Sequence, residues 1–117
     1  MPVRKYSDLL AAEVDMAGAQ NVLKKIPIGQ SEGWEGYTLR TFTLGPGGHT
    51  PRHSHDWEHV NYVIRGRGKL MIGGVDHDVD ERDFAFVPPG VEHQFSNPND
   101  AIFEFICIVP NRGEYPK

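Results

Sequence analysis

The stretch HSHDWEHVNYVIRGRG, residues 53–68, determines which fold this sequence predicts. Its centre, residues 59–65, is dense in β-branched and aromatic side chains and predicts a strand. Gly66-Arg67-Gly68 predicts a tight turn directly after it, because glycine takes backbone angles that other residues avoid. Three evenly spaced histidines precede or open the strand. The stretch thus predicts a strand that carries a histidine cluster at its start and a turn at its end.

Short strands separated by turns occupy most of the remaining chain. Residues 37–44 alternate polar and apolar side chains, and the glycines and proline of residues 45–48 are expected to end that strand. Residues 101–109, AIFEFICIV, carry the strongest strand pattern. Further strands are expected over residues 22–28, 69–72, 75–79, 84–87 and 91–96. Such a series predicts an all-β barrel or sandwich.

The two ends of the chain carry weaker patterns. Ser7-Asp8 is expected to cap a short helix over residues 9–14, and the polar tail after Pro110 is expected to lie on the surface. Pro27 marks residues 22–28 as an edge or bulged strand. Because an open edge leaves backbone groups unpaired, we expect a second copy to cover it and the protein to be a homodimer.

The composition excludes several classes of protein. The 117 residues suffice for one domain with a core of its own. The 16 acidic residues outnumber the 12 basic ones, which argues against nucleic acid as a partner. No apolar run approaches the ~20 residues that span a bilayer, and the opening residues do not resemble a signal peptide, so no membrane partner is expected. The single cysteine, Cys107, excludes an internal disulfide and favours a cytoplasmic location.

The histidines are the main candidates for chemistry. In a strand, His53 and His55 would face the same side, roughly 6.6 Å apart, and could converge on one ion. His59 follows at even spacing, and His93 could close the site from a separate strand. A single histidine on a strand is usually structural or solvated. His49, in a glycine-rich loop, and His77, at a hairpin, are interpreted in that way.

Two motifs resemble those of the cupin family. Residues 47–66 have the form G-x5-H-x-H-x3-H-x6-G, similar to the first cupin motif, and residues 88–97 have the form P-x-G-x2-H-x3-N, similar to the second. The resemblance implies a single-domain double-stranded β-helix, or jelly-roll barrel, over residues 1–117. The N-terminal arm would cover about residues 1–30 and the barrel core about residues 37–109.

Two positions depart from the family pattern. The family usually has a glutamate as third ligand, and the aligned residue here is His59. The resemblance therefore implies a four-histidine site of His53, His55, His59 and His93, as in small bacterial cupins with the signature HSHxWEH and a manganese ion. One divalent ion per chain is expected, manganese first and iron second, with nickel or zinc carried over from purification. Arg82 stands where the second motif opens on glycine, so that turn is expected to be built differently.

Four neutral imidazoles leave the full charge of a divalent ion uncompensated, which favours anionic ligands at two open positions of an octahedral ion. By resemblance, Arg40 and Phe105 are pocket residues. An inward arginine needs an anion, a substrate carboxylate or a fixed acid as partner. Cys107 is expected to be a small buried hydrophobe. The side chains expected to orient the ligand rings are Asp56, Glu58 and Glu92, with solvated turn charges as the alternative.

Three functions remain open at this point. The first is a metal-dependent oxidoreductase of dioxygenase type that uses O2 or peroxide on a small organic substrate. The second is a metal-dependent isomerase or epimerase, which needs a general base near the metal. The inward positions offer no convincing carboxylate or tyrosine for that role, and only Tyr62 and Glu104 stay open. The third is a cupin that binds a small molecule without catalysis. Fold alone does not choose among them.

Overall fold

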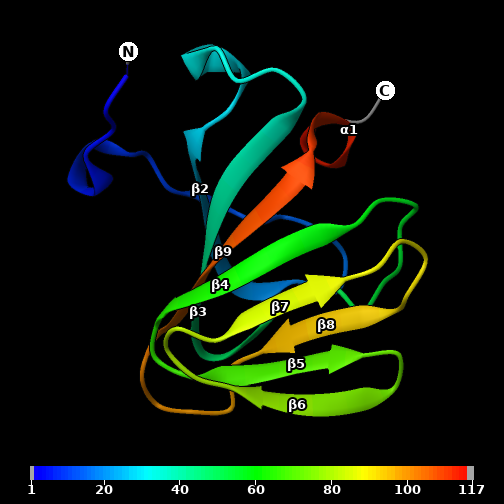
Figure 1. The fold of residues 1–117 in the computed structure, drawn as a ribbon. Coiled ribbons are helices and arrows are strands. Elements are labelled where there is room, and N and C mark those ends of the chain that lie inside the picture. The colour runs from blue at the N-terminus through cyan, green and yellow to red at the C-terminus, as the bar shows by residue number, and fades with distance from the viewer. Residues whose placement is uncertain (1, 116–117) are drawn as a thin grey trace.

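Residues 2–115, the part of the chain that the computed structural model describes, form one curled antiparallel sheet (Figure 1). The strands are β1 (Ala12–Glu13), β2 (Gln20–Ile28), β3 (Tyr37–His49), β4 (His59–Arg65), β5 (Gly68–Ile72), β6 (Val75–Val79), β7 (Phe84–Val87), β8 (His93–Ser96) and β9 (Phe103–Pro110). Their order is β6-β5-β8-β3-β9-β4-β7, with β2 paired beside β3 and β1 beside β2. The all-β jelly-roll expectation is confirmed.

The long strand β3 connects the two layers of the fold. Its first part pairs with β9, from Tyr37 opposite Pro110 to Leu44 opposite Phe103, while its last residue, His49, lies opposite Ser96 of β8. The expected end at residues 45–48 is wrong. Gly47 takes φ 73°, and backbone hydrogen bonds join residues 47 and 48 to Asn97. The glycines therefore bend the strand and do not end it.

The core lies between the layers and is centred on β9. Its inward residues Phe103, Phe105, Cys107 and Val109 are each at most 2% exposed. The ring of Phe105 stacks on that of Phe95 from β8, with centroids 3.9 Å apart. Each buried aromatic or large aliphatic side chain stabilises the fold by about 1.5–3 kcal/mol. The core thereby locks the strands whose ends carry the histidines.

The chain ends differ from the sequence predictions. The helix expected over residues 9–14 is absent among the described residues; a 3-10 turn at Tyr6–Asp8 and strand β1 take its place. The Tyr6 hydroxyl donates to Glu104, and the Val14 N–H donates to Val22, so contacts with the sheet outweigh a weak helix propensity. At the other end, the polar tail forms the short helix α1 (Asn111–Glu114).

The turn at Arg82 keeps the backbone shape that a glycine would give it. Arg82 lies at φ 74°, in the left-handed region that side chains with a Cβ rarely enter. The arginine accepts a strain of about 1–2 kcal/mol at a position that favours glycine, and the expectation of a turn built differently from the family's stays a prediction. This turn leads into β7 and lies away from the histidine cluster.

The edge expected at residues 22–28 is partly covered. Strand β2 pairs with β3 on one side, and β1 pairs with Leu23 and Lys24 on the other. The homodimer stays a prediction, but only the part of β2 that β1 leaves unpaired could pair with a second copy. No helix in residues 2–115 is long and apolar enough to cross a membrane.

Candidate metal centre

Four imidazole rings meet at one end of the barrel. His59 opens β4 and His93 opens β8, whereas His53 and His55 lie on the irregular segment between β3 and β4. The spacing of His53 and His55 predicted that both lie in a strand, but His53 lies outside the named strands. It forms an isolated antiparallel bridge with His93, and this bridge brings the two motifs together. Side-chain nitrogens of His53, His55 and His93 all lie within 4.8 Å of one another, close enough to hold one ion.

His59 adjoins this group of three. Its Nε2 lies 3.2 Å from Nε2 of His93, and its ring centroid is 5.5 Å from that of His55. His59 and His93 are each 3% exposed. The structure thus brings together all four histidines that the sequence singled out, with His53, His55 and His93 as the tightest set. His49 contacts its neighbour Thr50, and His77 is exposed on β6, in agreement with their interpretation.

The protons on three of these rings are placed by fixed acceptors. Nδ1 of His55 lies 2.9 Å from the Trp57 carbonyl, and Nδ1 of His93 lies 2.9 Å from the Val91 carbonyl. Nδ1 of His59 lies 2.6 Å from Oδ1 of Asn61. The Asn61 amide group donates to the Ile106 carbonyl at 3.2 Å, which orients its oxygen toward His59. Because Nδ1 donates in each case, Nε2 carries the lone pair.

Burial keeps the cluster neutral. Desolvation is the main cause that lowers the pKa of His55, His59 and His93, in each case to about 4. The charge of Arg40 lowers the pKa of His55 and His59 further, and the pKa of His53 is also lowered. Neutral imidazoles with free Nε2 lone pairs are the form that binds a metal.

Two of the three acidic side chains expected to orient the rings form ion pairs elsewhere. Asp56 pairs with Arg112 at 2.6 Å, and Glu92 pairs with Arg52 at 3.0 Å, both near the surface. The acceptors are instead two backbone carbonyls and Asn61. Sequence reasoning missed Asn61, although a polar residue two places after His59 on the same strand face was a usable signal.

A cavity of about 360 Å³ opens onto the histidines. Its wall is mainly apolar, and six of the lining residues are Arg40, Phe42, Trp57, Phe95, Phe105 and Cys107. The Trp57 ring stacks on His55 with centroids 4.3 Å apart. The size and apolar wall suit a small organic molecule. Arg40 and Phe105, singled out from the sequence, both line this cavity.

The guanidinium of Arg40 is the cationic group of the cavity wall. Its Nη1 donates to Glu114 at 3.3 Å and its Nη2 to the Cys107 sulfur at 3.0 Å, while its buried Nε has no partner. Glu114 also accepts from Lys24 at 2.8 Å. The Glu114 carboxylate therefore forms ion pairs with two cations, Arg40 and Lys24. The sequence predicted that Arg40 needs an anionic partner without naming it, and in the structure this partner is Glu114. Glu114 lies on α1, a helix that no sequence pattern predicted.

Helix α1 holds one side of the cavity mouth. Arg112 bonds to the side chain and carbonyl of Asp56, and Gly113 lies directly against Trp57. A Cβ on Gly113 would stand 2.7 Å from the Trp57 ring nitrogen, so only glycine allows this approach. The short helix thereby fixes Trp57 and presents Glu114 to Arg40.

The two remaining candidate bases lie outside the cavity. Tyr62 packs against Phe84 on the outer side of the sheet, with ring centroids 4.8 Å apart. Glu104 accepts hydrogen bonds from Tyr6 and from Thr43, the latter at 2.6 Å. Neither lines the cavity. Neither residue is therefore placed to act as general base beside the histidines.

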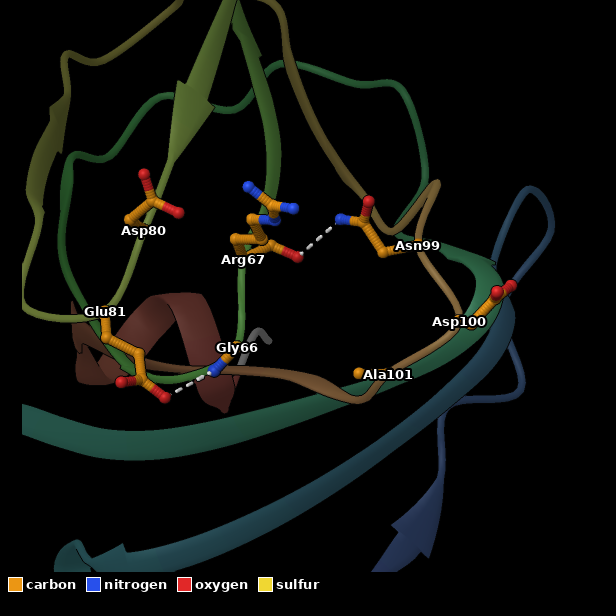
Figure 2. Close-up of a pocket in the computed structure, with 7 residues that line it drawn as sticks. All are labelled: Gly66, Arg67, Asp80, Glu81, Asn99, Asp100 and Ala101. Carbon is orange, nitrogen blue, oxygen red and sulfur yellow. Dashed lines mark hydrogen bonds between the residues drawn. The ribbon is translucent and has the colours of Figure 1, made fainter.

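A larger cavity of about 660 Å³ lies at the far ends of β4, β6 and β8 (Figure 2). Two of its polar side chains form hydrogen bonds that stabilise the turn at residues 66–67. Glu81 accepts from the Gly66 N–H at 3.0 Å, and Asn99 donates to the Arg67 carbonyl at 3.0 Å. It contains no histidine. The smaller cavity is therefore the candidate site.

A small single-domain β-barrel with a histidine cluster at one end is the arrangement that the two cupin-like motifs predicted. The chain belongs to the cupin family: the cupin domain profile, Cupin_2, matches residues 40–109. Its match covers both motifs and the strands that carry the histidines. The family resemblance seen in the sequence is thereby confirmed.

Three known proteins show what the chain is similar to. It is 34% identical over 79 residues to 1-methylthio-D-xylulose 5-phosphate methylsulfurylase of Rhodospirillum rubrum, a match of 68% of this chain and 51% of the relative. The chain thus spans about half the length of that curated relative. The polyketide cyclase RemF of Streptomyces resistomycificus has a TM-score of 0.89 and 28% identity, over 94% of this chain and 79% of RemF. A cupin-2 domain from Rhodospirillum rubrum has a TM-score of 0.79 and 30% identity, over 94% and 74%.

Proposed function

We propose that the chain binds one divalent metal ion through His53, His55, His59 and His93. One observation carries this proposal. Nε2 of His59 lies 3.2 Å from Nε2 of His93. Both rings donate their Nδ1 protons to fixed acceptors, so both Nε2 atoms carry lone pairs. Two lone pairs repel at this distance unless a cation lies between them. A bound ion removes that repulsion, and the donor chemistry of the cluster suits one.

The choice of metal rests on the resemblance to small bacterial cupins with the HSHxWEH signature. It favours manganese first and iron second, and imidazole ligands also accept nickel or zinc during purification. Such an ion supplies Lewis acidity, and manganese or iron also supplies redox chemistry with O2 or peroxide. We keep the cytoplasmic location as a prediction beside this assignment.

The cavity favours a small organic anion as substrate. The four histidines are neutral, so an ion would contribute its full positive charge, and Arg40 and Lys24 outnumber their shared partner Glu114 by one charge. Phe42 and Phe105 offer an apolar wall, with ring centroids 5.6 Å apart. The curated relative is named for a sugar phosphate, which is also an anion.

We infer an oxidoreductase of dioxygenase type as the first reaction class. Among the described residues that line the cavity there is no carboxylate or tyrosine to act as general base, which favours chemistry in which the ion does most of the work. The protein side chains would then exclude water and orient the anion toward the histidines. RemF, named as a polyketide cyclase, supports ring closure or isomerisation without net oxidation as the second class. A binding cupin without catalysis is the third.

Metal content tests the ligand set. We expect about one ion per chain in the wild type and a loss of most of it in His55→Ala and His93→Ala. His77→Ala is the matched control, because His77 is exposed on β6 and should change nothing. Full occupancy after loss of either named ligand would overturn the proposal.

Oxygen uptake separates the reaction classes. The metal-loaded protein is mixed with small carboxylates and phenolates, and both O2 consumption and product are followed. Oxygen consumption that His93→Ala abolishes supports the oxidative class. Substrate turnover without oxygen consumption supports the second class, and tight anion binding without turnover supports the binding protein.

A further inference from the structure

We propose that Arg40 binds the carboxylate of a small ligand with an apolar body, and that this ligand displaces Glu114 and thereby loosens helix α1. The carboxylate of Glu114 holds the place of the ligand when the cavity is free. This rests on the proposed function in that the ligand lies in the cavity at the histidines, but the exchange itself needs no bound ion.

Arg40 has more hydrogen-bonding capacity than the protein uses. A guanidinium carries five N–H donors. Nη1 reaches Glu114 only at 3.3 Å, Nη2 donates to the weakly accepting sulfur of Cys107, and the buried Nε has no partner. The side chain is 14% exposed, so little water reaches the remaining donors. Because buried donors without partners destabilise a fold, a carboxylate that accepts from two nitrogens of the guanidinium is the partner that fits this residue.

Glu114 is held more closely by Lys24 than by Arg40. Its Oε2 accepts from Lys24 at 2.8 Å, whereas its Oε1 accepts from Arg40 at 3.3 Å. The carboxylate can therefore leave Arg40 and keep its pair with Lys24. A ligand carboxylate would then balance the charges, because two cations would face two carboxylates. A phosphate dianion would leave one negative charge over, so the arrangement favours a carboxylate.

Helix α1 is attached to the sheet at both ends, and the exchange would free only one of them. Its last residue, Glu114, makes the contact with Arg40. At its first residue, the Asn111 N–H donates to the Gly36 carbonyl at 2.9 Å, and the Asn111 Oδ1 accepts from Thr38 at 2.8 Å. Loss of the Arg40 contact would loosen the C-terminal end of α1, while the end at Asn111 stays bound and acts as the hinge.

Movement of α1 would widen the cavity mouth. Gly113 and Trp57 both line the cavity, and Gly113 lies directly against the Trp57 ring. The remaining tie of the helix is the pair of Arg112 with Asp56, whose side chains are 55% and 80% exposed. Water competes with such an exposed pair, which therefore resists movement only weakly.

The apolar wall beside Arg40 suits the body of the ligand. The Phe42 ring lies beneath the guanidinium, with 4.9 Å between the Arg40 Cζ and the ring centroid, and Phe105 packs against Phe42. A flat apolar ligand on these rings would direct its carboxylate to Arg40. The cavity of about 360 Å³ has the size of a small-molecule site. Benzoate is therefore a suitable probe, and benzyl alcohol is its uncharged counterpart.

Calorimetric titration of the full chain with benzoate, metal-free and metal-loaded, tests the exchange. Arg40→Met should weaken benzoate binding about tenfold or more, because a hydrogen-bonded charge pair is lost. Glu114→Gln should strengthen it about fivefold or more, because the competing carboxylate loses its charge. Glu104→Gln is the matched control, since Glu104 is a buried carboxylate, 5% exposed, outside the cavity. It changes the net charge equally and should leave benzoate affinity unchanged.

Hydrogen exchange of the wild type tests the loosening of α1. The Tyr115 N–H donates to the Asn111 carbonyl at 2.7 Å across the helix, and the Asn111 N–H donates to Gly36 at the hinge. Saturating benzoate should speed exchange of the Tyr115 amide about tenfold and leave that of Asn111 unchanged. Benzyl alcohol should change neither.

Several outcomes would overturn the proposal: unchanged benzoate affinity in folded Arg40→Met, no gain in Glu114→Gln, or unchanged or slower exchange at Tyr115. Tighter binding of phenyl phosphate than of benzoate would overturn the carboxylate class. Circular dichroism checks folding, and Arg40→Lys, which lacks the planar fork, should also weaken binding if Arg40→Met does not fold. Metal content separates the two proposals: a chain that binds its ion but fails these tests overturns the exchange alone, and one that passes them without an ion supports the exchange and overturns the metal assignment.

Discussion

Asn61 offers the sharpest test of how the protein prepares its metal ligands. Its side chain is 1% exposed and makes two hydrogen bonds, one accepting from His59 Nδ1 at 2.6 Å and one donating to the Ile106 carbonyl at 3.2 Å. Asn61→Leu keeps the approximate size of the side chain and removes both bonds. We expect a fold that is less stable and a metal site that is weaker.

The size of both effects follows from these two contacts. The substitution leaves the His59 Nδ1–H and the Ile106 carbonyl buried without partners, and each such group costs about 1–3 kcal/mol of folding free energy. Loss of the group that orients a ligand histidine lowers metal affinity by about 10- to 100-fold. That range corresponds to about 1.4–2.8 kcal/mol of binding free energy.

Metal affinity is measured by chelator competition with Mn2+ and Zn2+, and stability by urea unfolding of the metal-free protein. Asn97→Leu is the matched control, because Asn97 is equally buried and donates to backbone carbonyls away from the histidines. It should lower stability and leave metal affinity unchanged. Asn61→Asp keeps the acceptor toward His59 and should retain metal.

Two outcomes would refute this reasoning. A folded Asn61→Leu protein with wild-type metal affinity would show that His59 needs no orienting partner or does not bind the ion. An equal loss of affinity in Asn97→Leu would show that metal binding simply follows global stability.

The remaining predictions concern charge at the site. His59→Glu should keep metal bound but weaken azide binding at least tenfold, a change of about 1.4 kcal/mol, because the carboxylate cancels one positive charge; equal azide affinity in a spectroscopic titration would remove His59 from the ligand set. Glu114→Gln should strengthen azide binding about fivefold or more, roughly 1 kcal/mol, since Arg40 and Lys24 lose their shared anion; unchanged affinity would contradict the role given to Arg40. For the pH dependence, the depressed histidine pKa values of about 4 mean that the unfolded chain binds more protons than the folded one between pH 6.5 and about 4. Stability of the metal-free protein should therefore fall as the pH is lowered through that window, and metal should be released only toward its lower end, as urea midpoints and metal content would show.

Much of the fold could be predicted because its signals are local. The strands over residues 59–65, 75–79 and 84–87 begin and end where side-chain alternation and turn residues indicated. The histidine spacing also singled out the four rings that converge. Where prediction failed, a distant contact outweighed the local pattern: β3 runs on through its glycines because Asn97 pairs with it, and the arm forms no helix because Tyr6 binds Glu104.

The sequence by itself thus determined the barrel, most of its turns and the candidate ligands, since these depend on periodicity and on residue types a few positions apart. Tertiary structure alone decided how the site is completed. Arg40 meets Glu114 across 74 positions, and the isolated bridge between His53 and His93 spans two separate motifs. Such pairings depend on how the strands curl around a shared core, and short-range patterns carry no information about groups so far apart along the chain.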